Sequence, residues 1–175
     1  MKLDSRLSIL LLVFSVLAAG QEAPSLDSPR TANPIQRLVC NTGYKISECQ
    51  QQLGVLRAAL APYPSHRLGT WTWVLVKSQD WKPIVQRMGG NADSPAFSVM
   101  EKRETFLEEA LFVAVGSRQV ELLRIWSIPV NKFLDVAITH ELGHGICHDL
   151  NEARAEVFSR LLREHKEPEC DTAHR

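Results

Sequence analysis

Two histidines and a glutamate in the C-terminal third of the chain have the types and spacing of a metal site. His140, Glu141 and His144 form the pattern H-E-x-x-H inside an apolar stretch that is typical of a helix. Residues four apart lie on one face of a helix, so both imidazoles can reach the same ion. Glu141 can then contact a water on that ion rather than the ion itself. The pattern predicts a zinc site that activates water for hydrolysis, with Glu141 as the general base.

A catalytic zinc site usually has three protein ligands, and two glutamates downstream are candidates for the third. Gly145 is expected to end the first helix and Asn151 to cap the next, which would make an antiparallel helical hairpin. In that hairpin Glu152 would lie near the second histidine, and Glu156, one turn further on, near the first. The spacing alone does not separate these two candidates.

The two motifs together resemble those of a known family. H-E-L-G-H at 140–144, followed by E-x-x-A-E at 152–156, is similar to the zincin metallopeptidases of the gluzincin type. The resemblance implies that Glu152 is the third zinc ligand and that Ala155 is a small packing residue. Glu156 stands where the family often has an aspartate that supports the ligands.

The resemblance covers residues 131–162 and implies an activity as well as a fold. It implies a peptide or protein substrate and one Zn²⁺ held by His140, His144 and Glu152. Glu141 would take a proton from the attacking water and deliver it to the leaving amine. The implied fold is a small α+β zincin-like domain. In it a short mixed sheet packs on the H-E-x-x-H helix, and a further C-terminal helix carries the third ligand.

A non-catalytic exported zinc-binding scaffold or binding module is the alternative function. It would need a closed site with a fourth protein ligand, for which His148, Cys147 and Glu156 are available. A structural site has no use for Glu141, which favours the enzyme. A metzincin-like site, with a third histidine six residues after the second, is excluded because Leu150 stands there.

The remaining elements are expected to position the motif helix. Patterning predicts helices from Ser47 to the prolines at 62 and 64, then over 78–88, 117–126, 131–147 and 151–164, and strands over 70–76, 96–100 and 105–107. Trp71, Trp73 and Leu75 share one strand face, which is expected to pack on a helix. The segment 96–107 is where an extended substrate would pair with an edge strand.

Several polar residues are weaker candidates for a role in the site. Glu108 and Glu109 suit either catalytic carboxylates or a solvated sheet edge. His148, Arg154 and Tyr44 are candidates for stabilising the oxyanion, and the sequence does not choose among them.

Composition sets limits on the class of partner. The 175 residues contain 20 Lys and Arg and 20 Asp and Glu, so the net charge is zero. This balance argues against binding nucleic acid through phosphate neutralisation. We therefore expect no nucleic-acid partner, while the oligomeric state is not set by composition.

The first twenty residues have the pattern of a secretory signal peptide (1–20). Basic residues precede an apolar run over 7–17, and Ala18-Ala19-Gly20 supplies small residues for cleavage after Gly20. An uncleaved anchor is the alternative, although the run is short for a membrane span. A flexible lead-in (21–37) and one zincin-like domain (38–175) are expected to follow, with no membrane span in the mature chain.

The cysteines agree with a periplasmic or extracellular location. All four follow the predicted signal peptide, and an even number in an oxidising compartment favours two disulfides. Of the three possible connectivities, local pairing of Cys40 with Cys49 and of Cys147 with Cys170 is expected.

Overall fold

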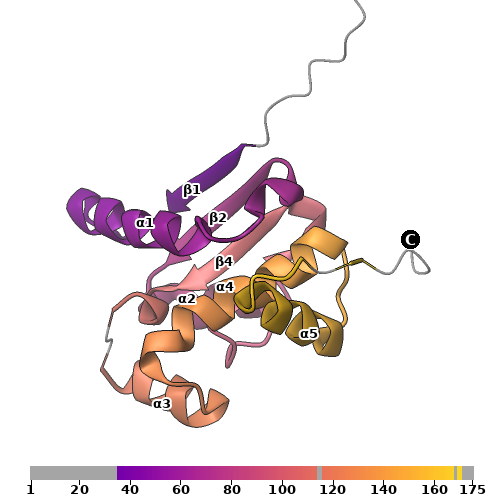
Figure 1. The fold of residues 1–175 in the computed structure, drawn as a ribbon. Coiled ribbons are helices and arrows are strands. Elements are labelled where there is room, and N and C mark those ends of the chain that lie inside the picture. Colours follow the sequence, from indigo (N-terminus) through magenta and orange to yellow (C-terminus); the bar gives the residue numbers. More distant parts are fainter. Residues whose placement is uncertain (1–34, 114–115, 168, 171–175) are drawn as a thin grey trace, which may run out of the picture. The chain divides into compact units, whose positions relative to one another are not determined.

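The computed structural model describes residues 35–113, 116–167 and 169–170. Over these residues the chain is α+β, with a small mixed sheet of four strands and five α-helices (Figure 1). The α+β class predicted from the sequence is thereby confirmed. The predicted signal peptide (1–20) and nearly all of the predicted lead-in (21–37) lie outside the described residues.

The sheet places an antiparallel strand at one edge of a parallel core. Its order is β1-β2-β4-β3, with β1 (Gln36–Cys40), β2 (Trp71–Val76), β3 (Ala96–Val99) and β4 (Glu104–Glu108). The first three strands in that order are parallel, whereas β3 runs antiparallel to β4 and forms an edge. The sequence did not predict β1, which begins at Gln36 inside the expected lead-in. The edge strand lies within the segment 96–107, where an edge was expected.

Helices cover both faces of the sheet. They are α1 (Ile46–Leu60), α2 (Ser78–Arg87), α3 (Gly116–Trp126), α4 (Val130–Cys147) and α5 (Glu152–Arg163). Trp71, Trp73 and Leu75 form one core cluster with α1 and α4, which cross the same face of the sheet in Figure 1. Trp81 of α2 packs on the opposite face, against Phe106. The strand face predicted to meet a helix therefore does so.

The motif helix ends at Cys147, as the patterning over 131–147 predicted, and not at Gly145. Gly145 was expected to end it, but α4 extends to Cys147, and His148 takes the left-handed conformation (φ 50°) after the last turn. Gly145 instead provides space, because a Cβ there would lie 2.5 Å from a Leu68 methyl carbon and 3.4 Å from the Trp71 ring. The glycine lets the helix lie close to the sheet.

Gly143 has the same function on the side of α4 that faces α5. A Cβ at this position would lie 3.0 Å from the carbonyl oxygen of Ala155 and 3.1 Å from the Phe158 Cβ. The glycine thus allows the backbones of α4 and α5 to approach closely, and Ala155 is buried at the contact. This close approach is what brings the first turn of α5 beside the histidines of α4.

Two disulfides link the helices to neighbouring segments, and both were predicted. Cys40–Cys49 joins β1 to α1, and Cys147–Cys170 joins the end of α4 to the chain beyond α5. Among the described residues, no helix has both the length and the apolar character needed to cross a bilayer.

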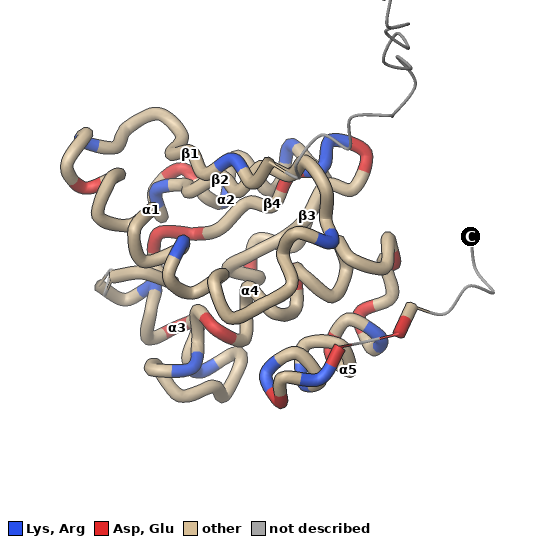
Figure 2. Tube along the Cα trace, turned by 45° about the horizontal axis from the view of Figure 1, so that its top comes forward, with Lys and Arg blue, Asp and Glu red and all other residues tan. Residues whose placement is uncertain are grey.

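The two consecutive glutamates at the end of β4, Glu108 and Glu109, are buried in ion pairs. Glu108 is fully buried and accepts hydrogen bonds from Arg118 at 2.9 Å, while Glu109 pairs with Lys77 at 2.7 Å. Burial raises the pKa of Glu108, and the Arg118 guanidinium opposes that rise. The interpretation as a solvated sheet edge is therefore wrong, because both carboxylates form buried ion pairs. Elsewhere charges of both signs are interspersed, as along α5 in Figure 2.

Candidate metal centre

Three predicted ligands meet where α5 begins beside α4. His140 and His144 lie one turn apart on α4, and Glu152 is the first residue of α5. The Nε2 atoms of the two imidazoles are 3.1 Å apart, and the Glu152 Oε2 lies 3.0 Å from that of His140 and 3.6 Å from that of His144. This group could hold a metal ion. The Glu152 side chain is 80% exposed, so the group opens to solvent.

The spacing of these donor atoms matches a tetrahedral site. Zinc takes nitrogen and oxygen ligands at about 2.0–2.1 Å, and the edges of such a tetrahedron are about 3.3 Å long. The three observed separations, 3.1, 3.0 and 3.6 Å, lie around that value. The donors are therefore close enough to share one ion without rearrangement of the backbone.

The second nitrogen of each imidazole faces an oxygen, which orients the ring. The Nδ1–H of His144 donates to the backbone carbonyl of Asp149 at 2.6 Å. The Nδ1 of His140 lies 3.7 Å from the Glu156 Oε2. A hydrogen on Nδ1 leaves the Nε2 lone pair directed at the group, as in most histidine–metal sites.

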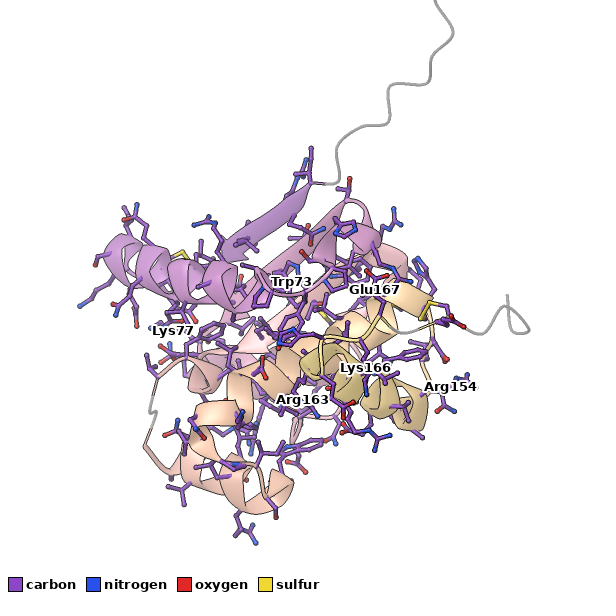
Figure 3. All side chains as sticks on the ribbon, in the orientation of Figure 1. Trp73, Lys77, Arg154, Arg163, Lys166 and Glu167 are labelled. Carbon is purple, nitrogen blue, oxygen red and sulfur yellow. A yellow bond between two sulfur atoms is a disulfide. The ribbon has the colours of Figure 1, made fainter. Side chains whose placement is uncertain are left out.

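Glu156 is held by a polar network between α4 and α5. Its other oxygen lies 3.8 Å from Nη2 of Arg163, and Nη1 of Arg163 donates to the Thr139 hydroxyl on α4 at 3.0 Å. Thr139 also shares a 2.8 Å hydrogen bond with Ser159. Figure 3 shows the Arg163 side chain between the two helices. Glu156 thus faces the outer nitrogen of His140, whereas Glu152 faces the inner nitrogens of both histidines.

Glu141 is buried beside this group without belonging to it. The side chain is on the sheet side of α4, only 4% of the residue is exposed, and its Oε2 accepts a hydrogen bond of 2.6 Å from the Ser98 hydroxyl. Burial raises the pKa of its carboxyl above the ordinary value, while the Ser98 hydrogen bond and the two histidines oppose that rise. A carboxyl of this kind is suited to taking up a proton.

A cleft of about 810 Å³ runs between the edge strand and α4 and contains the site. Its lining includes the whole of β3, the two histidines with Glu141 and Glu152, and apolar side chains of α4. Phe133, Val136 and Ala137 form the apolar wall, one or two turns before His140. At the rim the Trp126 indole donates to the carbonyl of Asp93 at 3.2 Å.

Other candidates from the sequence lie away from this cleft. Of the described residues that line it, none is His148, Arg154 or Tyr44, so the expected oxyanion donors are not brought to the site. Cys147 is engaged in its disulfide and offers no thiolate. Ser98 could not be predicted from the sequence, because a serine in a short strand carries no signal of contact with a residue 43 positions away.

The turn between α4 and α5 depends on an ionised aspartate. Asp149 accepts hydrogen bonds from the Arg154 guanidinium at 2.8 Å and from the Asn151 amide at 2.9 Å. Asn151 in turn caps α5 by accepting from the Arg154 amide at 3.0 Å, as predicted. The Arg154 hydrogen bonds and the Asn151 amide hold the pKa of Asp149 at about 2.

Replacing Asp149 by asparagine should lower the free energy of unfolding at neutral pH. Because the pKa in the folded chain lies below the ordinary 3.8, the carboxylate stabilises the fold above about pH 4, and this stabilisation is lost as the pH falls through about 2. The difference between wild type and Asp149→Asn, measured by urea unfolding at a series of pH values, should therefore shrink between pH 4 and 2. A difference that stays constant over this range would show that the charge of Asp149 is not responsible.

Comparisons of the chain with models of protein families, with curated proteins and with solved structures found no match.

Proposed function

We propose that the chain is an exported zinc metallopeptidase of the gluzincin type. One observation carries the proposal, namely that a group of two histidines and a glutamate shares a cleft with a buried carboxylate outside the group. A purely structural metal site has no need of that additional carboxylate, whereas hydrolysis needs a base.

The ligands would be His140, His144 and Glu152. Two imidazoles and one carboxylate are a common ligand set of catalytic zinc, and their separations suit a shared ion. Zinc held there would polarise a carbonyl and lower the pKa of a bound water to about 7. Glu156 would support His140 from its outer nitrogen, as Asp149 supports His144 through its carbonyl.

Glu141 would act as the general base. Its Oε2 is held by Ser98, and Glu141 itself lines the cleft. The carboxylate would take a proton from the attacking water and later deliver it to the nitrogen of the leaving amine. Burial keeps bulk water from competing for this proton.

The cleft supports an extended peptide as the substrate. One edge of β3 is paired with β4, and the whole strand lines the cleft, where a peptide backbone could add to the sheet. The opposite wall is apolar, so we expect a bulky apolar side chain next to the scissile bond.

Export of the protein is part of the same proposal. The signal-peptide pattern of residues 1–20 supports it, and the two disulfides of the structure fit an oxidising compartment.

The test is metal analysis and hydrolysis of a peptide library by protein recovered from an oxidising compartment. We expect one zinc ion per chain and cleavage next to bulky apolar residues, which a chelator abolishes and added zinc restores. Full zinc content without cleavage of any peptide would favour the zinc-binding scaffold. Absence of zinc after incubation with the metal would contradict the proposed ligands.

A further inference from the structure

Glu141 is connected to the interior of the sheet by a row of hydrogen bonds. Its Oε2 accepts from Ser98 at 2.6 Å, the Ser98 and Thr105 hydroxyls are 2.7 Å apart, and the Trp71 indole nitrogen donates to Thr105 at 2.9 Å. Trp71 is 1% exposed and Thr105 is fully buried. The proposed base is thus tied to a buried tryptophan through two hydroxyl groups.

The register of the sheet makes this row possible. Ser98 on β3 lies directly opposite Thr105 on β4, and Thr105 lies opposite Trp73 on β2. Since side chains alternate along a strand, Trp71 shares the face of Trp73, which is the face covered by α4. The row crosses three strands and ends on the helix.

The two end groups of the row determine which group donates and which accepts in each hydrogen bond. An indole N–H can only donate, and a carboxylate can only accept. Thr105 therefore accepts from Trp71 and donates to Ser98, and Ser98 donates to Glu141. Each group in the row donates its hydrogen to the next, and the last hydrogen bond is donated to Oε2 of Glu141. Oε1 receives no hydrogen bond from any described residue.

Packing alone does not account for these polar groups. Their neighbours on the same face, Ala96 and Leu107, are buried and apolar. Burying hydroxyl groups costs free energy that alanine and valine would avoid, and the hydrogen bonds at best offset this cost. What the row adds is a fixed position for the carboxylate of Glu141 on the cleft side of α4.

We propose that Ser98, Thr105 and Trp71 are positioning residues that hold Glu141 by its Oε2 and keep its Oε1 available in the cleft. The catalytic consequence, that Oε1 takes the proton of the attacking water, rests on the proposed function. The row itself involves no metal. Because Ser98 belongs to the edge strand, the position of the Glu141 carboxylate is fixed relative to the strand along which an extended peptide would bind.

The first test is made on the metal-free protein by nuclear magnetic resonance of the indole N–H groups. Ser98→Ala and the isosteric Thr105→Val should both shift the resonance of Trp71, while Thr105→Ser, which keeps the hydroxyl, should restore it towards the wild-type position. The indole of Trp81, which donates to the Ser94 carbonyl, is the internal reference and should not move. An unmoved Trp71 resonance in Ser98→Ala would overturn the proposal.

The second test measures the metal affinity and kinetics of the same variants. Ser98→Ala and Thr105→Val should lower kcat about tenfold, with KM and zinc affinity unchanged, and Thr105→Ser should recover most of the loss. An active enzyme whose kcat is unaffected in both variants would overturn the positioning role. If the wild type hydrolyses nothing, the proposed function fails, and the indole resonances alone decide whether the row holds Glu141. Ser98→Ala is at a partly exposed edge position, so it remains informative if Thr105→Val does not fold.

Discussion

Replacing Glu141 by glutamine should lower kcat for peptide hydrolysis at least about 100-fold, the lower end of what a general base contributes. Glutamine has the same size, and its carbonyl oxygen can still accept the hydrogen bond of Ser98. The variant should therefore fold and bind zinc as the wild type does. It loses only the ability to take a proton from the attacking water.

The matched control is Glu101→Gln, which removes one negative charge from the same cleft. Glu101 is exposed, and no hydrogen bond links it to the histidines or to Ser98 within the described part of the chain. Its replacement should change kcat by less than about threefold, because an exposed charge is well screened. Equal losses in the two variants would indicate an effect of cleft charge rather than of a base. Full activity of Glu141→Gln would rule out the proposed mechanism.

Replacing His144 by alanine should abolish stoichiometric zinc binding. His144 is buried, its Nε2 faces both other members of the group, and its ring is oriented by the Asp149 carbonyl. Loss of a ligand should weaken zinc binding more than the 10- to 100-fold that is typical of losing a supporting group. Zinc should raise the melting temperature of the wild type but not of this variant, since a ligand that binds only the folded state stabilises it.

The control for this change is His148→Ala, four residues further on. His148 is exposed beyond the end of α4 and does not line the cleft, so zinc binding should be unchanged. Zinc titrations of the glutamine variants distinguish the two candidate glutamates. Glu152→Gln should weaken zinc binding more than Glu156→Gln, because only Glu152 faces the inner nitrogens of both histidines. The opposite order would assign the third ligand to Glu156.

Features that depend on neighbours along the chain could be predicted from the sequence alone. The spacing of His140 and His144 places both rings on one helical face, whatever the rest of the fold does. The cap at Asn151 is equally local, and both disulfides join cysteines that are close in sequence. Short-range geometry is enough for these features, and the structure agrees with each of them.

Features that depend on segments far apart in the chain could not be predicted, because they arise from tertiary packing. Strand β1, with the sequence QRLVC, does not alternate between apolar and polar residues, and it forms because β2 offers a parallel edge. Gly145 has the residue type of a helix end, but its neighbours Leu68 and Trp71 make it a point of close packing. Likewise, the sequence suggests a surface or catalytic role for Glu108, whereas in the structure it is buried and paired with Arg118, which is ten residues away.

The environment of the proposed base depends most on the tertiary structure. Ser98 and Thr105 are ordinary strand residues in sequence, and a shift of one residue in strand register would move both to the other face of the sheet. Only the observed pairing of β3 with β4, covered by α4, brings a hydroxyl to Glu141. The sequence indicates that a carboxylate follows a predicted metal ligand, but the partners of that carboxylate come from strands whose pairing is set by packing across the whole domain.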